Sequence, residues 1–287
     1  MLKLFPKITW LVCFIVAWSV LLILAPSPLL QLVKYAHYSL LGVLGAIFAN
    51  STGAGGGVVF IPAFHHLAFS SEQSIATSLA IQCFGMTAGA ITWGTHYQRC
   101  TKSLRVWQGF TKISLFASCV SVLGVWFIYS TNQLMPTSLH YSFSWFSLIL
   151  GGLMLLTLLM AKPHRERSQI SKFDWLMLAL LSLIGGMITA WLSVGVGELL
   201  AIYLILRRFD ITMAVSIAVV VSAVTVWSAI WQHTVVAFHV VWQVVIFAGP
   251  SAILGGIFAK TLVSYLSARK LKLFFACWLL IIGMVGI

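Results

Sequence analysis

The chain has 287 residues, of which 61% are hydrophobic and only 8% are charged, and its formal net charge at pH 7 is +12. This much apolar surface excludes a soluble globular protein and predicts an all-α membrane protein with many spans. The positive charge does not indicate a nucleic-acid partner, because the basic residues lie in short loops between apolar runs, where they orient a membrane protein and meet anionic lipid headgroups.

The first apolar run, residues 8–25, follows Lys3 and Lys7, as the apolar region of a signal peptide would. The Ala25-Pro26 sequence is a poor cleavage site, because proline directly after the small residue disfavours cleavage. We therefore interpret residues 1–35 as an N-terminal transmembrane span.

Eight further apolar segments follow, at residues 38–69, 75–95, 107–129, 143–161, 175–206, 213–234, 240–267 and 271–287. Residues 38–69 and 175–206 are too long for one simple span, and glycines interrupt each of them, at Gly53-Ala54-Gly55-Gly56-Gly57 and at Gly195-Val196-Gly197. Each is either one broken helix that crosses the bilayer or a re-entrant hairpin that enters and leaves on the same side. In both cases the irregular backbone must be buried in protein or line a cavity.

The lysine and arginine residues favour the re-entrant arrangement. If both segments are re-entrant and the N-terminus is cytoplasmic, the cytoplasmic side holds Lys3, Lys7, Arg99, Lys102, Arg105, Lys162, Arg165, Arg167, Lys172, Arg207, Arg208, Arg269, Lys270 and Lys272. The outer side holds only Lys34 among loop residues. This bias predicts two re-entrant elements and about seven full spans, with the C-terminus outside. Residues 175–192 are long enough to span, so a mixed arrangement stays open.

The two glycine-broken segments belong to a longer repeat. Gly53 and Gly55 align with Gly195 and Gly197; further aligned positions are Thr77-Ser78 with Ser216, Trp93 with Trp231, and Trp107 with Trp242. In the re-entrant topology the halves face opposite ways, which predicts two inverted repeats, residues 36–161 and 174–287. Glycine-broken elements in inverted repeats are typical of alternating-access transporters, whose substrate binds at the repeat interface.

The first glycine break predicts an anion site. Glycines leave backbone N–H groups accessible, and a helix that starts near Val58 would aim its positive N-terminus at the middle of the bilayer. The expected substrate-binding residues are Asn50, Ser51, Thr52, Gly53, Gly55, Gly56, Gly57, Thr77, Ser78 and Gln82 in the first half and Ser193, Gly195, Gly197 and Ser216 in the second. The alternatives are close helix packing for the glycines and hydrogen bonds within one helix for the hydroxyl groups.

Glu198 is an acidic residue well inside an apolar run, just before a helix start expected near Leu199. An unpaired intramembrane carboxylate costs about 3 kcal/mol, so such a residue is a functional candidate. Two roles fit: a proton carrier that couples transport to the proton gradient, or a cap on its own helix that occupies the place of an anion.

The segment from Leu44 to Pro62, with Ser74-Ile75-Ala76-Thr77-Ser78 downstream, resembles the signature of the TauE/SafE sulfite-exporter family. That signature is a G-x-G-G-G turn, an apolar stretch that ends in proline, and an A-x-x-T-S-like cluster, and the resemblance covers nearly the whole chain. The second half departs from it, with Glu198 where the family often has glycine and Leu204 where it often has proline. The resemblance implies a bacterial inner-membrane permease for small anions such as sulfite, sulfoacetate or other organosulfonates.

The sequence therefore predicts a transporter that exports small anions. It has no Walker motif, so ATP does not drive transport directly and the protein is expected to be a secondary transporter. Proton-coupled uptake and a membrane-assembly or redox-relay role without transport are the alternatives. No nucleophile–base motif predicts an enzyme, and no His/Cys spacing predicts a metal site, so neither a cofactor nor a metal is expected. The expected partners are a small anion, membrane lipids and, as an option, a second copy in a homodimer, but no nucleic acid.

Overall fold

The computed structural model describes residues 16–20, 22–23, 28–101, 104–131, 138–160, 167, 169–265 and 268–285. Most of the predicted N-terminal span lies outside the described residues. The described residues form helices and turns and contain no strand. The helices are α2 (Pro28–Tyr35), α3 (Tyr38–Thr52), α4 (Gly57–His66), α5 (Ser71–His96), α6 (Phe110–Ser130), α7 (Leu139–Met160), α8 (Lys172–Leu192), α9 (Val196–Leu206), α10 (Ile211–Trp231), α11 (Trp242–Tyr265) and α12 (Ala268–Val285).

The all-α membrane fold predicted from composition is confirmed. Among the described residues, six helices are long and apolar enough to cross a membrane, or seven if α2 and α3, which meet at a bend of 47°, form one span. Short π-helical turns extend α5 (Tyr97–Thr101) and α10 (Gln232–Val236), and a 3-10 turn (Arg105–Trp107) precedes α6.

Polar residues at the loop ends start the long helices. The Ser70 hydroxyl accepts from the Gln73 amide at the start of α5, and Asp210 accepts from the Met213 amide at the start of α10. Ser171 and Asp174 cap α8 reciprocally. Each such cap satisfies amides that the first turn of a helix leaves free, so short polar loops are enough to reverse the chain between apolar helices.

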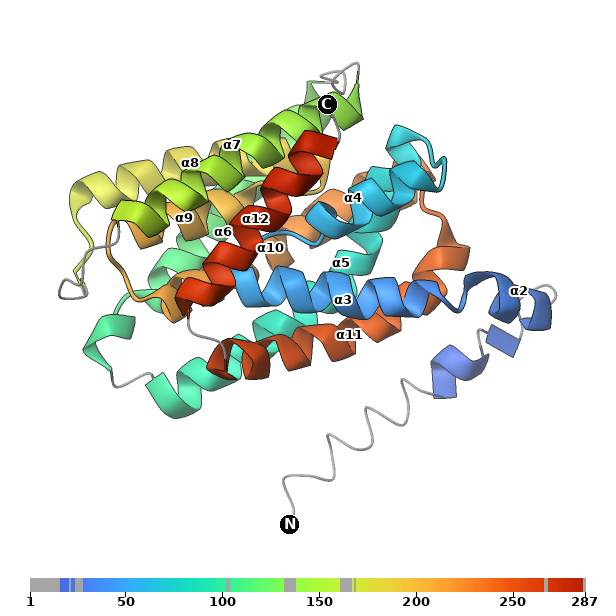
Figure 1. Cartoon of the computed structure of the whole chain (residues 1–287), viewed down its shortest axis with the longest axis horizontal. Coiled ribbons are helices and arrows are strands. Elements are labelled where there is room, and N and C mark those ends of the chain that lie inside the picture. Colours follow the sequence, from blue (N-terminus) through green and yellow to red (C-terminus); the bar gives the residue numbers. More distant parts are fainter. Residues whose placement is uncertain are drawn as a thin grey trace, which may run out of the picture.

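The first glycine-broken segment is a hairpin. α3 ends at Gly53, whose φ of 81° lies in the left-handed region that favours glycine. α4 begins at Gly57 and returns along α3, so closely that a Cβ on Gly45 would lie 2.6 Å from the Phe60 ring. Both ends of this hairpin lie at the right-hand end of the bundle in Figure 1. The segment is therefore folded as a hairpin, which is the form that the re-entrant prediction requires.

The second glycine-broken segment is also a hairpin. α8 ends at Ser193 with a φ of 60°, and α9 returns along α8, where a Cβ on Gly185 would lie 2.6 Å from the Cα of Val196. α9 begins at Val196, three residues before the expected start near Leu199, because the Glu198 side chain closes its first turn by accepting from the Gly195 amide. Although α8 is long enough to span, it forms one arm of a hairpin.

An ionic cluster joins the two ends of this second hairpin. Asp174, at the start of α8, is fully buried and accepts from the Arg207 Nε at 2.6 Å and from the Tyr203 hydroxyl at 2.8 Å. Arg167 lies 3.3 Å from the same carboxylate, and its backbone amide donates to the Arg208 carbonyl at 2.9 Å. Charged hydrogen bonds of this kind fix α9 to α8 at the end where both arms emerge.

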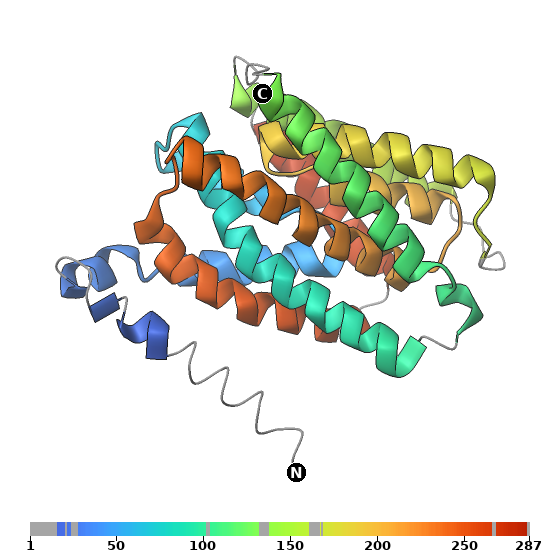
Figure 2. The ribbon, with the colours of Figure 1, turned by 180° about the vertical axis from the view of Figure 1, so that it is seen from behind.

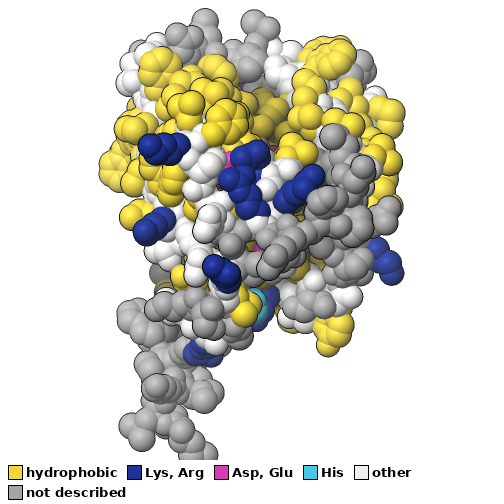
Figure 3. Space-filling model, turned by 90° about the vertical axis from the view of Figure 1, so that its left-hand side faces the viewer, with side chains coloured by type: hydrophobic (Ala, Val, Ile, Leu, Met, Phe, Trp, Pro, Cys, Tyr) yellow, Lys and Arg dark blue, Asp and Glu magenta, His cyan; other side chains and the backbone are white. Residues whose placement is uncertain are grey.

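The two hairpins enter the bundle from opposite ends. α4 runs back to the right in Figure 1, whereas α9 runs back to the left. Seen from behind, α6, α10, α5 and α11 lie in sequence, each packed against the next (Figure 2). The left-hand end, which we call the basic end, carries Arg99, Arg105, Arg167, Lys172, Arg207, Arg208, Lys260 and Lys270, and Figure 3 shows lysine and arginine side chains gathered there. Lys34 lies in α2, at the other end.

The helix ends correct the predicted register of the repeat. The left-handed residues that end α3 and α8 are Gly53 and Ser193, and the N-caps of α5 and α10 are Ser70 and Asp210. Each pair is separated by 140 positions, so Gly53 corresponds to Ser193 rather than to Gly195. The predicted register was wrong by two residues because a serine takes the left-handed position that sequence alone assigns to glycine.

The tryptophan pairs in that register also differ in environment. Trp93 is 1% exposed and Trp231 is 56% exposed, while Trp107 is 3% and Trp242 is 52% exposed. At the 140-residue spacing Trp93 instead corresponds to His233, which is buried as well. The interpretation of the halves as inverted copies stays a prediction.

Candidate functional site

The two helix breaks cross inside the bundle and touch through their backbones. A Cβ on Gly57 would lie 2.6 Å from the Ser193 carbonyl oxygen, and a Cβ on Gly197 would overlap the Gly53 carbonyl oxygen. Since real Cβ atoms do not approach backbone atoms this closely, glycine at these two positions lets the breaks meet. These two glycines therefore have the close-packing role that was considered above as the alternative to anion binding.

Glu198 joins the N-termini of both broken helices. Its Oε1 accepts from the Gly55 amide at 2.8 Å, and its Oε2 accepts from the Gly195 amide at 2.8 Å. The residue is 1% exposed. Each helix N-terminus carries about half a positive charge, so the two together provide the surroundings of one anion without a lysine or arginine side chain. The Glu198 carboxylate accepts a hydrogen bond at each of these two N-termini.

Gln82, on α5, links the same two breaks through neutral groups. Its Oε1 accepts from the Gly56 amide at 2.8 Å, and its Nε2 donates to the Ser193 carbonyl at 3.0 Å and the Ser193 hydroxyl at 2.8 Å. The Nε2 atom also lies 3.1 Å from the Ser78 hydroxyl, which accepts from the Ser193 hydroxyl at 2.9 Å. The first-half residues Ser78 and Gln82 and the second-half residue Ser193 thus form one buried polar cluster.

Other residues expected at the site have partners elsewhere. The Thr77 hydroxyl accepts from the Val241 amide at 3.1 Å, so it contacts the residue just before α11 rather than the breaks. Ser216 donates to the Thr212 carbonyl at 2.6 Å, which is the hydrogen bond within one helix considered above as the alternative. Ser51 and Thr52 both donate to the Phe48 carbonyl of their own helix. Of these residues Thr52 also contacts the first break, because its hydroxyl accepts from the Ala54 amide at 3.2 Å.

Asn50 ties α3 to α5 just before the first break. Its Nδ2 donates to the Ala46 carbonyl at 2.8 Å and the Gly85 carbonyl at 3.2 Å, and its backbone carbonyl accepts from the Trp93 indole at 3.1 Å. Among the described residues its Oδ1 has no hydrogen-bond partner. Asn50 therefore supports the last turn of α3 and leaves one acceptor unused.

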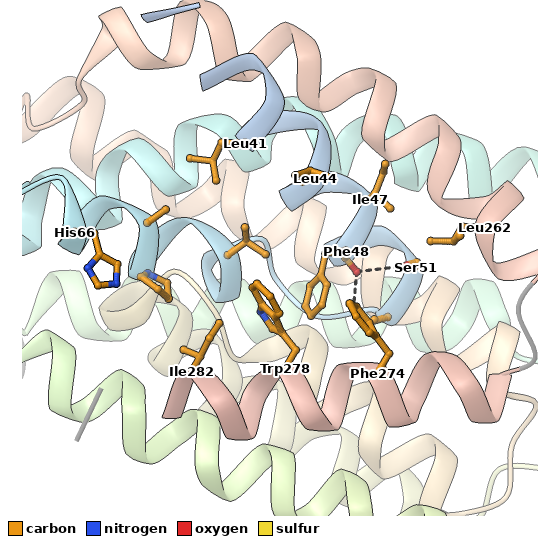
Figure 4. Close-up of a pocket in the computed structure, with 14 residues that line it drawn as sticks. Leu41, Leu44, Ile47, Phe48, Ser51, His66, Leu262, Phe274, Trp278 and Ile282 are labelled. Atoms are coloured by element: carbon orange, nitrogen blue, oxygen red, sulfur yellow. Dashed lines mark hydrogen bonds between the residues drawn. The ribbon is translucent and has the colours of Figure 1, made fainter. Parts of the chain in front are cut away.

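An apolar pocket reaches the first break from the side. It has a volume of about 640 Å³ and lies between the α3–α4 hairpin and α12, where Phe274, Trp278 and Ile282 line it (Figure 4). Its lining is almost wholly apolar, and it touches Ser51 and Thr52, whose hydroxyls are engaged with Phe48. Apart from His66 this pocket offers a charged ligand few partners, so it is a poorer candidate for an anion site than the crossing of the breaks.

The family model described as "Sulfite exporter TauE/SafE" matches residues 38–285, which include both hairpins. The chain belongs to the sulfite exporter TauE/SafE family. No curated protein and no solved structure matches it. Membership confirms the family that the sequence resembles, and with the multi-pass helical fold it identifies the protein as a membrane transport protein of an anion-exporter family.

In this TauE/SafE protein, the described residues contain no group of three histidine, cysteine or acidic side chains arranged to hold a metal. The chemistry that the crossing offers is backbone amides, one carboxylate, one amide side chain and two serine hydroxyls. The amides and hydroxyls are neutral groups of the kind that bind oxyanions in proteins, whereas the carboxylate would repel a second anion.

Proposed function

We propose that the protein is a secondary transporter that exports small anions such as sulfite, sulfoacetate or other organosulfonates across the bacterial inner membrane. The observation that carries this proposal is the convergence of the Gly55 and Gly195 amides, from two broken helices, on one buried carboxylate. A place that holds a carboxylate through amides alone suits the oxygens of a sulfite or sulfonate.

Residues 36–161 and 174–287 would act as the two transport repeats, with residues 1–35 as an additional span. Because the hairpins enter from opposite ends, a rocking motion of one half against the other would expose the crossing to each side in turn. The membrane orientation follows from charge: the basic end faces the cytoplasm, so the N-terminus is cytoplasmic and α12 ends outside.

The membrane potential would favour export. Moving one elementary charge through 100 mV changes its free energy by about 2.3 kcal/mol, and an inside-negative potential drives an anion outward. Proton-coupled uptake is the second candidate, because Glu198 is a buried carboxylate at the crossing that a proton would neutralise.

The redox-relay alternative has less support. Of the described cysteines, Cys83 is buried on α5, whereas Cys119 and Cys277 are exposed on α6 and α12. A relay would need a pair of cysteines close to each other. Replacement of all five cysteines should leave anion flux intact if the protein is a transporter.

The test is flux of sulfite, sulfoacetate and simple sulfonates in proteoliposomes, under an imposed potential with and without a pH gradient. Export driven by the potential alone is the expected result. Flux that requires a proton gradient would support the uptake candidate, and no flux of any of these anions would reject both.

A further inference from the structure

Glu198 occupies the place where an anion would meet the protein. Its two oxygens take the Gly55 and Gly195 amides at 2.8 Å each, and it is 1% exposed. A hydrogen donor held by a carboxylate is not free for a second anion, and two negative charges at this separation repel strongly in a low-dielectric interior. A substrate anion and the Glu198 carboxylate therefore cannot use these amides together.

A second observation marks a ligand position at the same turn. Ser222 is 2% exposed, and in the described structure its hydroxyl has no hydrogen-bond partner. It faces the first turn of α9, since a Cβ on Gly197 would lie 2.5 Å from its Oγ. At the 140-residue spacing it corresponds to Gln82, which does engage a break by accepting from the Gly56 amide. Buried hydroxyls are usually satisfied, so Ser222 provides an unused hydroxyl next to Gly197, the residue before Glu198.

We propose that Glu198 is a tethered competitor of the substrate, which binds to the Gly55 and Gly195 amides and the Ser222 hydroxyl after the carboxylate has left them. This inference rests on the proposed function, because it concerns the same site. The ligand class is an oxyanion that presents at least two acceptor oxygens on one centre, as carboxylates, sulfite and sulfonates do. Removal of the carboxylate should therefore free the site for such an ion added from solution.

The experiment measures binding to the purified full-length protein in detergent, by titration calorimetry and by thermal stability, with sodium formate and sodium sulfite as probes. In E198A we expect saturable stabilisation by formate and an affinity for sulfite about tenfold above that of the wild type, within the usual range for coupled sites. The matched control is E72A, which removes a carboxylate from the first turn of α5 and should behave as the wild type. E198A,S222A should lose much of the gained affinity.

E198Q gives a second measurement that does not depend on a cavity, because its side chain keeps the size of glutamate. Its neutral oxygen still accepts from one amide but no longer repels an anion, so sulfite affinity should rise, by less than in E198A. Unchanged affinity for formate and sulfite in E198A, or in E198Q if E198A does not fold, would overturn the inference. If the wild type carries no sulfur anion in proteoliposomes while E198A gains formate binding, the site stands and the proposed transport function falls.

Discussion

Replacement of Gly57 by alanine should separate the two helix breaks. The added Cβ would lie 2.6 Å from the Ser193 carbonyl oxygen and 3.0 Å from the Ser193 carbonyl carbon, on the backbone of the other hairpin. To restore an ordinary contact, the breaks must move apart by roughly 0.8 Å, and over-packing of this kind costs about 1–3 kcal/mol. The same shift stretches the 3.0 Å hydrogen bond from Gln82 to the Ser193 carbonyl.

If that cost falls on the state that binds the anion, sulfite flux drops by about 5- to 150-fold, because each 1.4 kcal/mol is a factor of ten. The assay is the initial rate of flux in proteoliposomes at equal protein content. Gly152→Ala on α7 is the matched control, since in the described structure a Cβ there would meet no atom within 4 Å. Equal flux in Gly57→Ala, Gly152→Ala and the wild type would refute the role of close contact between the breaks.

Three further predictions address single contacts. Gly56→Leu should abolish flux without preventing membrane insertion, because even a Cβ at this position would lie 2.8 Å from the Phe60 ring and 2.9 Å from Gln82; full activity in reconstituted protein would contradict the anion-site model. Glu198→Gln should change the dependence of flux on pH, because the side chain no longer exchanges a proton; an unchanged profile from pH 5 to 8 would leave Glu198 without a coupling role. Arg207→Met should lower the free energy of unfolding by about 1.5–3 kcal/mol, the usual worth of a charged hydrogen bond, since Asp174 keeps Arg167 and Tyr203; an unchanged denaturation midpoint in detergent would show that the ionic cluster contributes nothing to stability.

The glycine-broken segments were predictable because apolar length and charge distribution are properties of the sequence. Residues 38–69 and 175–206 are too long for one span, and the basic residues fall at one end only if both segments fold back. The hairpins of α3–α4 and α8–α9 have that form. The first hairpin turns at the predicted glycines, with α3 ending at Gly53 and α4 beginning at Gly57. For the second hairpin the sequence did not predict the turn residue, because Ser193 adopts a left-handed conformation that sequence reasoning assigns to glycine.

The contents of the site were only partly predictable. Ser78 and Gln82 are four residues apart on α5, so they share one face and meet at the breaks. Thr77, one residue earlier, points about 100° away and contacts Val241, just before α11, instead. The bridge that Glu198 makes to Gly55 joins residues 143 positions apart, and such a contact depends on how the two hairpins cross.

The ionic cluster of Asp174 shows the same limit of local reasoning. The S-x-x-D pattern from Ser171 to Asp174 is a sequence signal for a helix start, and the structure has that cap. The ion pair with Arg207 appears only when α9 folds back along α8. A cap residue next to a re-entrant segment is therefore a candidate partner for the arginines at the far end of that segment.

The most direct test of the central claim is to locate a bound substrate analogue. Selenite resembles sulfite and scatters X-rays anomalously, so a crystal structure of the full chain grown with selenite would place the anion. The account predicts an anomalous selenium peak next to the Gly55 and Gly195 amides, with selenite oxygens within hydrogen-bond distance of both and the Glu198 carboxylate displaced. A peak elsewhere, with Glu198 still bound to both amides in every state that carries the anion, would contradict it.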